Sequence, residues 1–256
     1  MPDTNGRFVW YELMTTDPAG ARAFYRSVVG WNPVDAKMPG MDYWMFKMGE
    51  RPVAGVMELP EEARAMGTPP CWIGYVAVGD VDAAAAEAKA QGGNVYVPPT
   101  DIPSVGRFSI AADAHGATLA LFKSANPDED LPLEPDKPGH IGWHELHASD
   151  LETDFAFYAA LFGWVKKEAV DMGGMGVYQT FGISDVTLGG MMNKMPNMPV
   201  PFWTYYFNVG NIDEAAERVK VAGGQIMFGP EAVPGGTFIL MGSDPQGAGF
   251  ALMGGR

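Results

Sequence analysis

Residues 142–150 read GWHELHASD and bring two histidines and one glutamate into a single short segment. Imidazole and carboxylate groups are common metal ligands, and they are also the groups that most often transfer protons in enzymes. Residues 9–17 read VWYELMTTD and keep the Trp-x-Glu-Leu pattern and the closing Asp, but without the histidines. The chemistry of the first segment therefore has to be judged against a near copy of itself.

Strand alternation decides which of these side chains can act together, because residues two apart on a strand share a face. Trp143, Glu145 and His147 are expected on one face and His144 on the other. The two histidines then cannot bind one ion from a regular strand. The corresponding face of the first copy offers an indole and a carboxylate but no imidazole: Trp10, Glu12 and Met14.

Three interpretations of Glu145 and His147 stay open at this point. The carboxylate can be structural and bonded to backbone or to an arginine. The pair can recognise a ligand, with Trp143 as a pocket wall. It can also act as a catalytic acid and base.

Composition narrows the classes of partner. The 256 residues carry a net charge of −14, which argues against nucleic acid and anionic membranes as partners, because both attract basic surfaces. Cys71 is the only cysteine, so no intrachain disulfide can form, and no catalytic role is assigned to it. No signal peptide or membrane-spanning stretch is visible, so a cytoplasmic protein is expected.

The chain repeats itself. Residues of the first copy recur 133 positions later near its start, as Trp10, Phe24 and Gly30 do, and 131 positions later near its end. A segment rich in Pro and acidic residues separates the copies. We therefore expect a first domain at 1–123, a linker at 124–138 and a second domain at 139–256.

Each copy divides again into two units of one strand, one helix and three strands. In the first unit, 9–15 is a predicted strand, Asp17 a helix N-cap, Pro18 the first helical residue and Gly30 the stop. Asp80 caps a second helix. Further strands are predicted near 31–37, 42–48, 52–59, 72–78, 94–97, 107–111 and 118–122. A βαβββ unit exposes one face of its sheet and must pair with another unit to close a core.

The order of these elements resembles the vicinal oxygen chelate superfamily, which includes glyoxalase I, bleomycin-resistance proteins and extradiol dioxygenases. The motifs that carry the resemblance are FYRSVVGW and FYAALFGW after the first helix, and DAHGATLALF and DPQGAGFALM at the end of each copy. It covers 7–123 and 139–254. WYELMTTD and WHELHASD are similar to its tandem branch, whose members carry glyoxalase-like and hydroxylase labels. The resemblance implies an α+β fold with four βαβββ modules forming two curved mixed sheets around a cleft.

Metal-binding members of this superfamily place one ligand, usually His or Glu, on each of four strands. The matching positions here hold Trp10, Glu58, Tyr75 and Ala120 in the first copy, and Trp143, Asn193, Tyr206 and Ala251 in the second. We therefore expect no family-type metal centre and no cofactor. Tyr75 and Tyr206 join Trp10, Glu12, Trp143, Glu145 and His147 as candidate ligand-binding residues.

The resemblance favours a protein that binds a small carbonyl-bearing or aromatic molecule, with Glu145 and His147 as the candidate catalytic pair. One alternative is a lyase, isomerase or dioxygenase that recruits a divalent ion through Glu58, Glu145 or His147. Another is a protein that only sequesters its ligand. The chain is expected to be a monomer with an internal pseudo-dimer, or a homodimer. The other two histidines, His140 and His115, are expected to face solvent.

Overall fold

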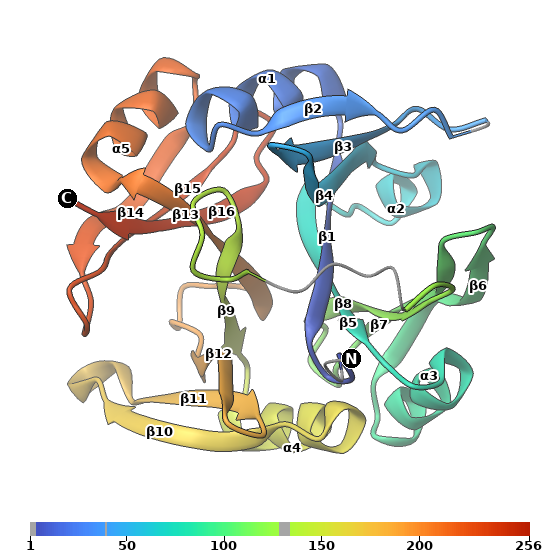
Figure 1. The fold of residues 1–256 in the computed structure, drawn as a ribbon. Coiled ribbons are helices and arrows are strands. Elements are labelled where there is room, and N and C mark those ends of the chain that lie inside the picture. The colour runs from blue at the N-terminus through green and yellow to red at the C-terminus, as the bar shows by residue number, and fades with distance from the viewer. Residues whose placement is uncertain (1–3, 39, 128–133) are drawn as a thin grey trace. The chain divides into compact units, whose positions relative to one another are not determined.

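The computed structural model describes residues 4–38, 40–127 and 134–256. Four βαβββ modules follow one another in this part of the chain (Figure 1). Module 1 contains β1 (Phe8–Thr15), α1 (Pro18–Val28), β2 (Asn32–Asp35), β3 (Tyr43–Met48) and β4 (Arg51–Glu58), and the short helix α2 (Glu61–Ala65) follows it. Module 2 contains β5 (Cys71–Ala77), α3 (Val81–Ala90), β6 (Asn94–Ile102), β7 (Gly106–Ala112) and β8 (Thr118–Ser124).

The second copy repeats this order. Module 3 contains β9 (Ile141–Ala148), α4 (Leu151–Phe162), β10 (Val165–Asp171), a 3₁₀ turn (Gly173–Met175), β11 (Val177–Ile183) and β12 (Val186–Asn193). Module 4 contains β13 (Phe202–Asn211), α5 (Ile212–Val221), β14 (Gln225–Ala232), β15 (Phe238–Ser243) and β16 (Gly249–Gly255). The predicted βαβββ order is confirmed in all four modules, whereas the short helix α2 was not predicted.

The strands form two mixed sheets of eight strands each, in the orders β2-β3-β4-β1-β5-β8-β7-β6 and β10-β11-β12-β9-β13-β16-β15-β14. In each module the first strand runs parallel to the last one, as β1 does to β4 and β9 to β12, and the other pairs inside a module are antiparallel. This confirms the α+β class with two mixed sheets.

Helix starts follow the predicted chemistry. The carboxylate of Asp17 accepts the backbone N–H of Gly20, and Pro18 occupies the first turn, where its missing N–H costs nothing. Asp80 accepts from Ala83 in the same way at the start of α3. At the end of α1, Gly30 adopts a φ of 89°, a left-handed conformation that favours glycine.

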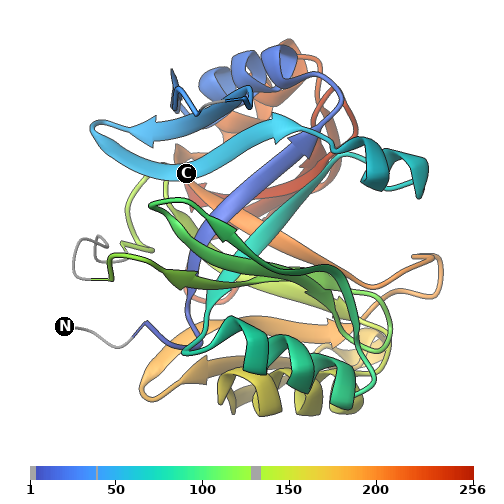
Figure 2. The same ribbon diagram turned by 90° about the vertical axis from the view of Figure 1, so that its right-hand side faces the viewer.

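Packing groups the modules into two compact units. Among the described residues, unit 1 takes 4–9, 74–127 and 143–203, and therefore combines modules 2 and 3. Unit 2 takes 10–73, 134–142 and 204–256, and combines modules 1 and 4. Within unit 1 the helices α3 and α4 lie side by side, and within unit 2 α1 and α5 do (Figures 1 and 2). The boundaries 1–123, 124–138 and 139–256 stay a prediction.

Each unit has an aromatic core that includes a fully buried tyrosine from one of its helices. In unit 2, Tyr25 of α1 is fully buried against Trp31 and Trp72. In unit 1, Tyr158 of α4 packs against Trp164 and Trp203 in the same arrangement. Burial of such large rings dominates the hydrophobic stabilisation of a core. No helix in the described ranges is long and apolar enough to cross a bilayer.

Candidate functional site

In unit 2, three side chains are linked by hydrogen bonds on the face of β1 that carries Trp10 and Glu12. The indole Nε1 of Trp10 donates to the hydroxyl of Tyr43 over 3.2 Å, and that hydroxyl donates to Oε2 of Glu12 over 3.0 Å. Trp10 and Tyr43 are half-buried, while Glu12 at the end of the series is 5% exposed. The arrangement fixes the orientation of one carboxylate oxygen.

The same arrangement recurs on β9 in unit 1. Trp143 donates to the hydroxyl of Tyr178 over 2.8 Å, and that hydroxyl donates to Oε2 of Glu145 over 2.9 Å. Burial is the first cause, and the nearby Glu145 the second, of a pKa of Tyr178 raised above its ordinary value. Tyr178 therefore stays protonated and remains a hydrogen-bond donor.

A glycine on the neighbouring strand makes room for each tyrosine. Gly55 of β4 lies opposite Glu12, and Gly190 of β12 lies opposite Glu145. A Cβ added to Gly55 would overlap the Tyr43 hydroxyl, and one added to Gly190 would overlap the phenol ring of Tyr178. A side chain at either position would therefore break the Trp–Tyr–Glu chain.

The second oxygen of Glu12 distinguishes the first copy. Oε1 is buried and has no hydrogen-bond partner among the described residues. Burial raises the pKa of Glu12 from 4.5 to about 8, and the hydrogen bonds from Tyr43 and Trp10 only partly oppose this shift. Near neutral pH the carboxyl group is therefore mostly protonated and can donate a hydrogen bond as well as accept one.

The second oxygen of Glu145 has an imidazole beside it. Nε2 of His147 lies 3.0 Å from Oε1 of Glu145, and both side chains are buried. The relative orientation of the two groups does not meet the angular criteria for a hydrogen bond. The contact between His147 and Glu145 is therefore electrostatic. Phe202 stacks on the ring of His147 with centroids 4.6 Å apart. The structure thus brings together three of the predicted site residues, Trp143, Glu145 and His147.

His144 lies on the opposite face of β9, as the alternation predicts. Its ring stacks on Phe8 at 3.9 Å, and Nδ1 lies 2.6 Å from the carbonyl oxygen of Leu188. Burial lowers the pKa of His144 from 6.5 to about 4, so the ring is neutral and belongs to the core of unit 1. It cannot join His147 in binding one ion.

The expectation that Glu58 and Asn193 occupy a ligand position is wrong. Glu58 pairs with Thr15 in the sheet, on the face opposite Glu12, and is exposed in an ion pair with Arg64. Asn193 is exposed, and its Oδ1 accepts the backbone N–H of Leu151 at the start of α4. The expected match was misplaced because Gly55 and Gly190, which carry no functional group, stand opposite the glutamates.

Of the two remaining histidine expectations, the one for His140 is wrong. His140 is 8% exposed rather than solvated, and its backbone pairs with Asn208 of β13. His115 is exposed, as expected, but its Nδ1 also lies 2.5 Å from the buried carboxylate of Asp154. Sequence position near a turn says little about a side chain that another element covers.

The two remaining predicted site residues, Tyr75 and Tyr206, lie one in each unit. Tyr75 belongs to unit 1, where it is half-buried near Phe108 and Phe122 and pairs with Ala120 in the sheet. Tyr206 belongs to unit 2, is 2% exposed, and pairs with Ala251.

Sequence reasoning missed Tyr43 and Tyr178, which complete both chains of hydrogen bonds. The signal was present: these tyrosines recur 135 positions apart, and so do Gly55 and Gly190. The change of spacing, from 133 at the first strand to 135 here, hides the correspondence when a single offset is used.

The donor set does not fit the metal ion of the superfamily. Indole and methyl side chains, as in Trp10, Ala120 and Ala251, offer no lone pair to a divalent cation. Among the described residues, no group of three or more His, Cys, Asp or Glu side chains is arranged to hold an ion. No step of the chemistry below therefore involves a metal.

Comparison with known proteins places the chain. It matches the Glyoxalase/Bleomycin resistance protein/Dioxygenase superfamily over residues 7–121 and 137–252, and it belongs to that family. It is 35% identical, over 95% of its length and 93% of the relative, to the protein named "Putative glyoxylase CFP32" of Mycobacterium tuberculosis. It is 28% identical to the anthracycline biosynthesis protein DauV of Streptomyces sp., covering 97% of this chain and 93% of that protein.

Solved structures show the same fold at low sequence identity. The 2,3-dioxygenase LapB from Pseudomonas sp. KL28 matches with a TM-score of 0.66 and 14% identity, covering 97% of this chain and 92% of the other. The Mn(II)-bound glyoxalase from Novosphingobium aromaticivorans matches with a TM-score of 0.63 and 18% identity, covering 98% and 82%. At such identities the likeness establishes the fold alone.

Proposed function

We propose that the chain binds a small carbonyl-bearing or aromatic molecule on the face of β9, where Glu145 and His147 act as the catalytic acid–base pair. One observation carries the proposal: the Trp–Tyr–Glu chain occurs in both copies, but only the second adds an imidazole, 3.0 Å from the carboxylate. Trp143 and Phe202 supply apolar walls of the kind that small-molecule sites use.

The relatives support a small-molecule substrate. One carries the name of a glyoxylase and another that of an anthracycline biosynthesis protein. These names describe those proteins, and they share the theme of small organic molecules. Transfer of that theme to this chain is part of the proposal.

Tyr178 and His147 have different roles at Glu145, and the chemistry follows from these roles. Tyr178 donates to one oxygen of Glu145 and so leaves the other free to face His147. The pair can remove a proton from carbon beside a carbonyl group and return one to the carbonyl oxygen. Such a transfer needs no redox partner, because the proton moves between substrate and protein only.

The β1 face of unit 2 would bind a ligand without this chemistry. Glu12 is mostly protonated near neutral pH and lies beside Met14, which cannot titrate. It can offer a hydrogen bond to a carbonyl oxygen but has no imidazole to exchange protons with. We therefore assign ligand binding by Trp10 and Glu12 to this face, and turnover to the β9 face.

A ligand screen followed by one substitution tests the proposal. A thermal-shift screen of small carbonyl and aromatic compounds should find a stabilising ligand, since occupancy at a hundred times Kd adds about 2.7 kcal/mol to the free energy of unfolding. The substitution His147→Met, which copies Met14, should weaken the shift and abolish turnover of that ligand. Met14→Leu is the matched control and should change neither.

The outcomes separate three functions. Loss of turnover with retained binding in His147→Met supports catalysis. Binding without turnover in the wild-type chain points to sequestration. Equal effects of His147→Met and Met14→Leu would return Glu145 and His147 to a structural role.

Metal content is the second test, since a divalent ion would change the mechanism. Protein purified without added metal and dialysed against a weak chelator should contain well under one equivalent of zinc, nickel, iron or manganese. The physical reason is the lack of a converging donor set in the described residues. One stoichiometric ion that is lost in Glu145→Gln would favour a metal-dependent enzyme instead.

A further inference from the structure

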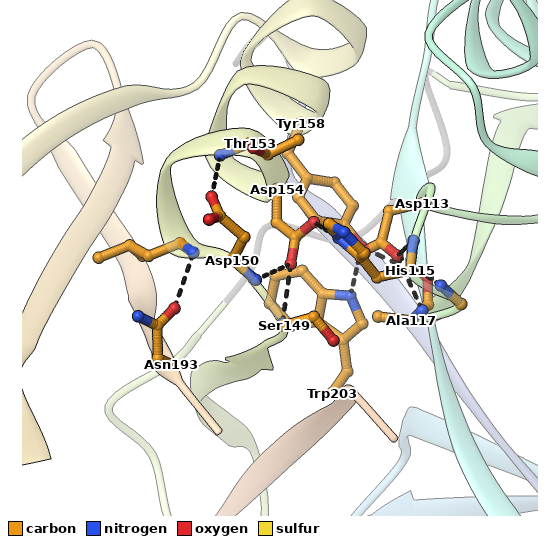
Figure 3. A network of polar contacts seen from close by, with 12 residues as sticks. Asp113, His115, Ala117, Ser149, Asp150, Thr153, Asp154, Tyr158, Asn193 and Trp203 are labelled. Carbon is orange, nitrogen blue, oxygen red and sulfur yellow. Dashed lines mark hydrogen bonds and ion pairs between the residues drawn. The ribbon is translucent and has the colours of Figure 1, made fainter. Parts of the chain in front are cut away.

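We infer that Asp154 and His115 are positioning residues that fix the end of β9 and thereby the presentation of Glu145 and His147. The inference rests on the proposed function of the β9 face. It adds a pH-dependent control to that site, built from two residues that are 39 positions apart in the sequence. Figure 3 shows the network within unit 1.

Asp154 holds the backbone directly after the site. Its Oδ2 accepts the backbone N–H of Ser149 over 3.0 Å and that of Asp150 over 3.3 Å. Ser149 is only two residues beyond His147, at the point where β9 ends and α4 begins. The side chain of Asp154 is 1% exposed, so these two hydrogen bonds lie in a poorly solvated environment.

His115 balances the charge of that buried carboxylate. Its Nδ1 lies 2.5 Å from Oδ1 of Asp154, while its own side chain remains 35% exposed. A buried carboxylate without a partner is costly, so the strength of its other hydrogen bonds depends on whether the partner is charged. The protonation of an accessible imidazole is thereby connected, through a buried carboxylate, to the backbone directly after the site.

Hydrogen bonds fix the position of the turn that carries His115. Asp113 accepts the backbone N–H groups of His115, Gly116 and Ala117 with one oxygen. Its other oxygen accepts the hydroxyl of Tyr158, which in turn accepts the indole N–H of Trp203. His115 can therefore change its charge without the turn leaving α4.

The other copy lacks both positioning residues. Ala21 stands where Asp154 does, and Gln246 stands where His115 does. The tyrosine and aspartate of the network are kept there, since Tyr25 donates to Asp244 over 3.1 Å. The ion pair is thus an addition to a common framework, found in the copy that also carries His147 beside Glu145.

The charges around His115 set the direction of its response. The described groups that face it are Asp154 and Asp150 from the start of α4 and Asp113 from its own turn, all acidic. The hydrogen bond to Asp154 is the main cause of a raised pKa of His115. The ion pair is therefore complete below the ordinary imidazole pKa and is lost as the pH rises through the higher folded value.

Loss of the positive charge on His115 at alkaline pH should weaken the hydrogen bonds that Asp154 accepts from the backbone N–H groups of Ser149 and Asp150. The end of β9 would then gain freedom, and the 3.0 Å approach of His147 to Glu145 would vary. The site is consequently expected to be best ordered at acidic to neutral pH and less ordered above the pH at which His115 loses its proton.

Nuclear magnetic resonance of the four histidines in the full chain tests the inference without a ligand. The imidazole signals of His147 should show an inflection at the pH where His115 titrates, and amide exchange at Ser149 and Asp150 should accelerate above it. In His115→Gln, which copies Gln246, the inflection should vanish and exchange should no longer depend on this titration.

Two further variants separate charge from packing. Asp154→Asn keeps a side-chain oxygen for the N–H groups of Ser149 and Asp150 but removes the charge, so it should abolish the inflection while unit 1 stays folded. Gln246→His adds a histidine to the equivalent turn, where Ala21 stands in place of Asp154, and should leave His147 unaffected. A persisting inflection of His147 in folded His115→Gln would overturn the inference.

The result is independent of the ligand screen. If His147→Met leaves ligand binding and turnover unchanged while the inflection is present, the proposed function fails and the positioning link holds. If His147→Met abolishes turnover but His147 never senses His115, the link fails and the proposed function holds.

Discussion

Glu12 shows how one buried oxygen can make stability depend on pH. Its pKa is about 8 in the folded chain against 4.5 as the ordinary value, mainly because of burial. Between these two values the unfolded chain has released the proton while the folded chain keeps it. The free energy of unfolding therefore falls as the pH rises through this window, and above it becomes level.

The substitution Glu12→Gln should remove this slope. At pH 5 the variant should match the wild-type chain, and at pH 9 it should be more stable by an amount on the order of 5 kcal/mol at most. Urea titrations at several pH values measure it. The exposed Glu50→Gln is the control and should leave the slope intact; an unchanged slope in Glu12→Gln would show that Glu12 is ionised in the folded state.

His144 contributes the opposite slope. Burial lowers its pKa to about 4 from 6.5, so the unfolded chain binds a proton first as the pH falls. Stability from this group is fully present above pH 6.5 and is lost as the pH falls towards 4. His144→Asn, which keeps a donor for the carbonyl of Leu188, should make stability less dependent on pH in this window, as thermal unfolding from pH 4 to 7 would report.

At the scale of elements, the strands next to β1 and β9 decide whether the Trp–Tyr–Glu chains can exist. Gly190→Ala places a methyl group in the ring of Tyr178 and should destabilise the protein by about 1–3 kcal/mol. Gly79→Ala is the matched control, because nothing lies within 4 Å of the added Cβ. Denaturant midpoints compare the two; equal effects would mean that Tyr178 moves aside without cost.

The four edge strands carry features that discourage pairing with another chain. Pro33 lies in β2, Pro98 and Pro99 in β6, and Pro230 in β14, and proline cannot donate to a further strand. The fourth edge, β10, has no proline but has an irregular register between Lys166 and Ala169. Charged side chains and bulges protect such edges.

Removing a charged side chain from β10 should make this edge strand available for pairing with another chain. Lys167→Val is expected to promote concentration-dependent association through this edge, whereas Lys123→Val on β8, a strand with neighbours on both sides, should not. Sedimentation velocity over a range of concentrations distinguishes them. Identical behaviour of both variants would mean that the irregular register alone protects β10.

Local chemistry explains what the sequence could predict. The N-cap at Asp17, the proline after it and the left-handed Gly30 act over a few residues, so the pattern of elements was accessible. The His115–Asp154 pair was not, because the other copy has no ionisable residue at either position and 39 positions separate the two residues. Only tertiary packing brings them together.

At the scale of the whole molecule, a buried tyrosine of each copy is hydrogen-bonded to an aspartate of the other copy. Tyr25 of the first copy donates to Asp244 of the second, and Tyr158 of the second donates to Asp113 of the first. Each compact unit is thus built from one module of each copy, while each sheet is built from the two modules of one copy. Neither copy contains a complete unit.

Separated copies should therefore depend on a partner. A fragment of residues 1–123 contains both Tyr25 and Asp113. In the full chain Tyr25 donates to Asp244 and Asp113 accepts from Tyr158, so in a pair of identical fragments Tyr25 of each can donate to Asp113 of the other. We expect this fragment to fold only as a homodimer, with stability that rises with its concentration. Circular dichroism and analytical ultracentrifugation of the fragment measure both properties.

The tyrosine hydroxyl provides the control for that experiment. In the fragment, Tyr25→Phe leaves the buried Asp113 without its donor and should weaken the homodimer by about 1–3 kcal/mol for each lost bond. Asp113 also accepts three backbone N–H groups of its own turn, so the turn should survive the change. A fragment that is folded and monomeric, and insensitive to Tyr25→Phe, would show that each copy closes its own core.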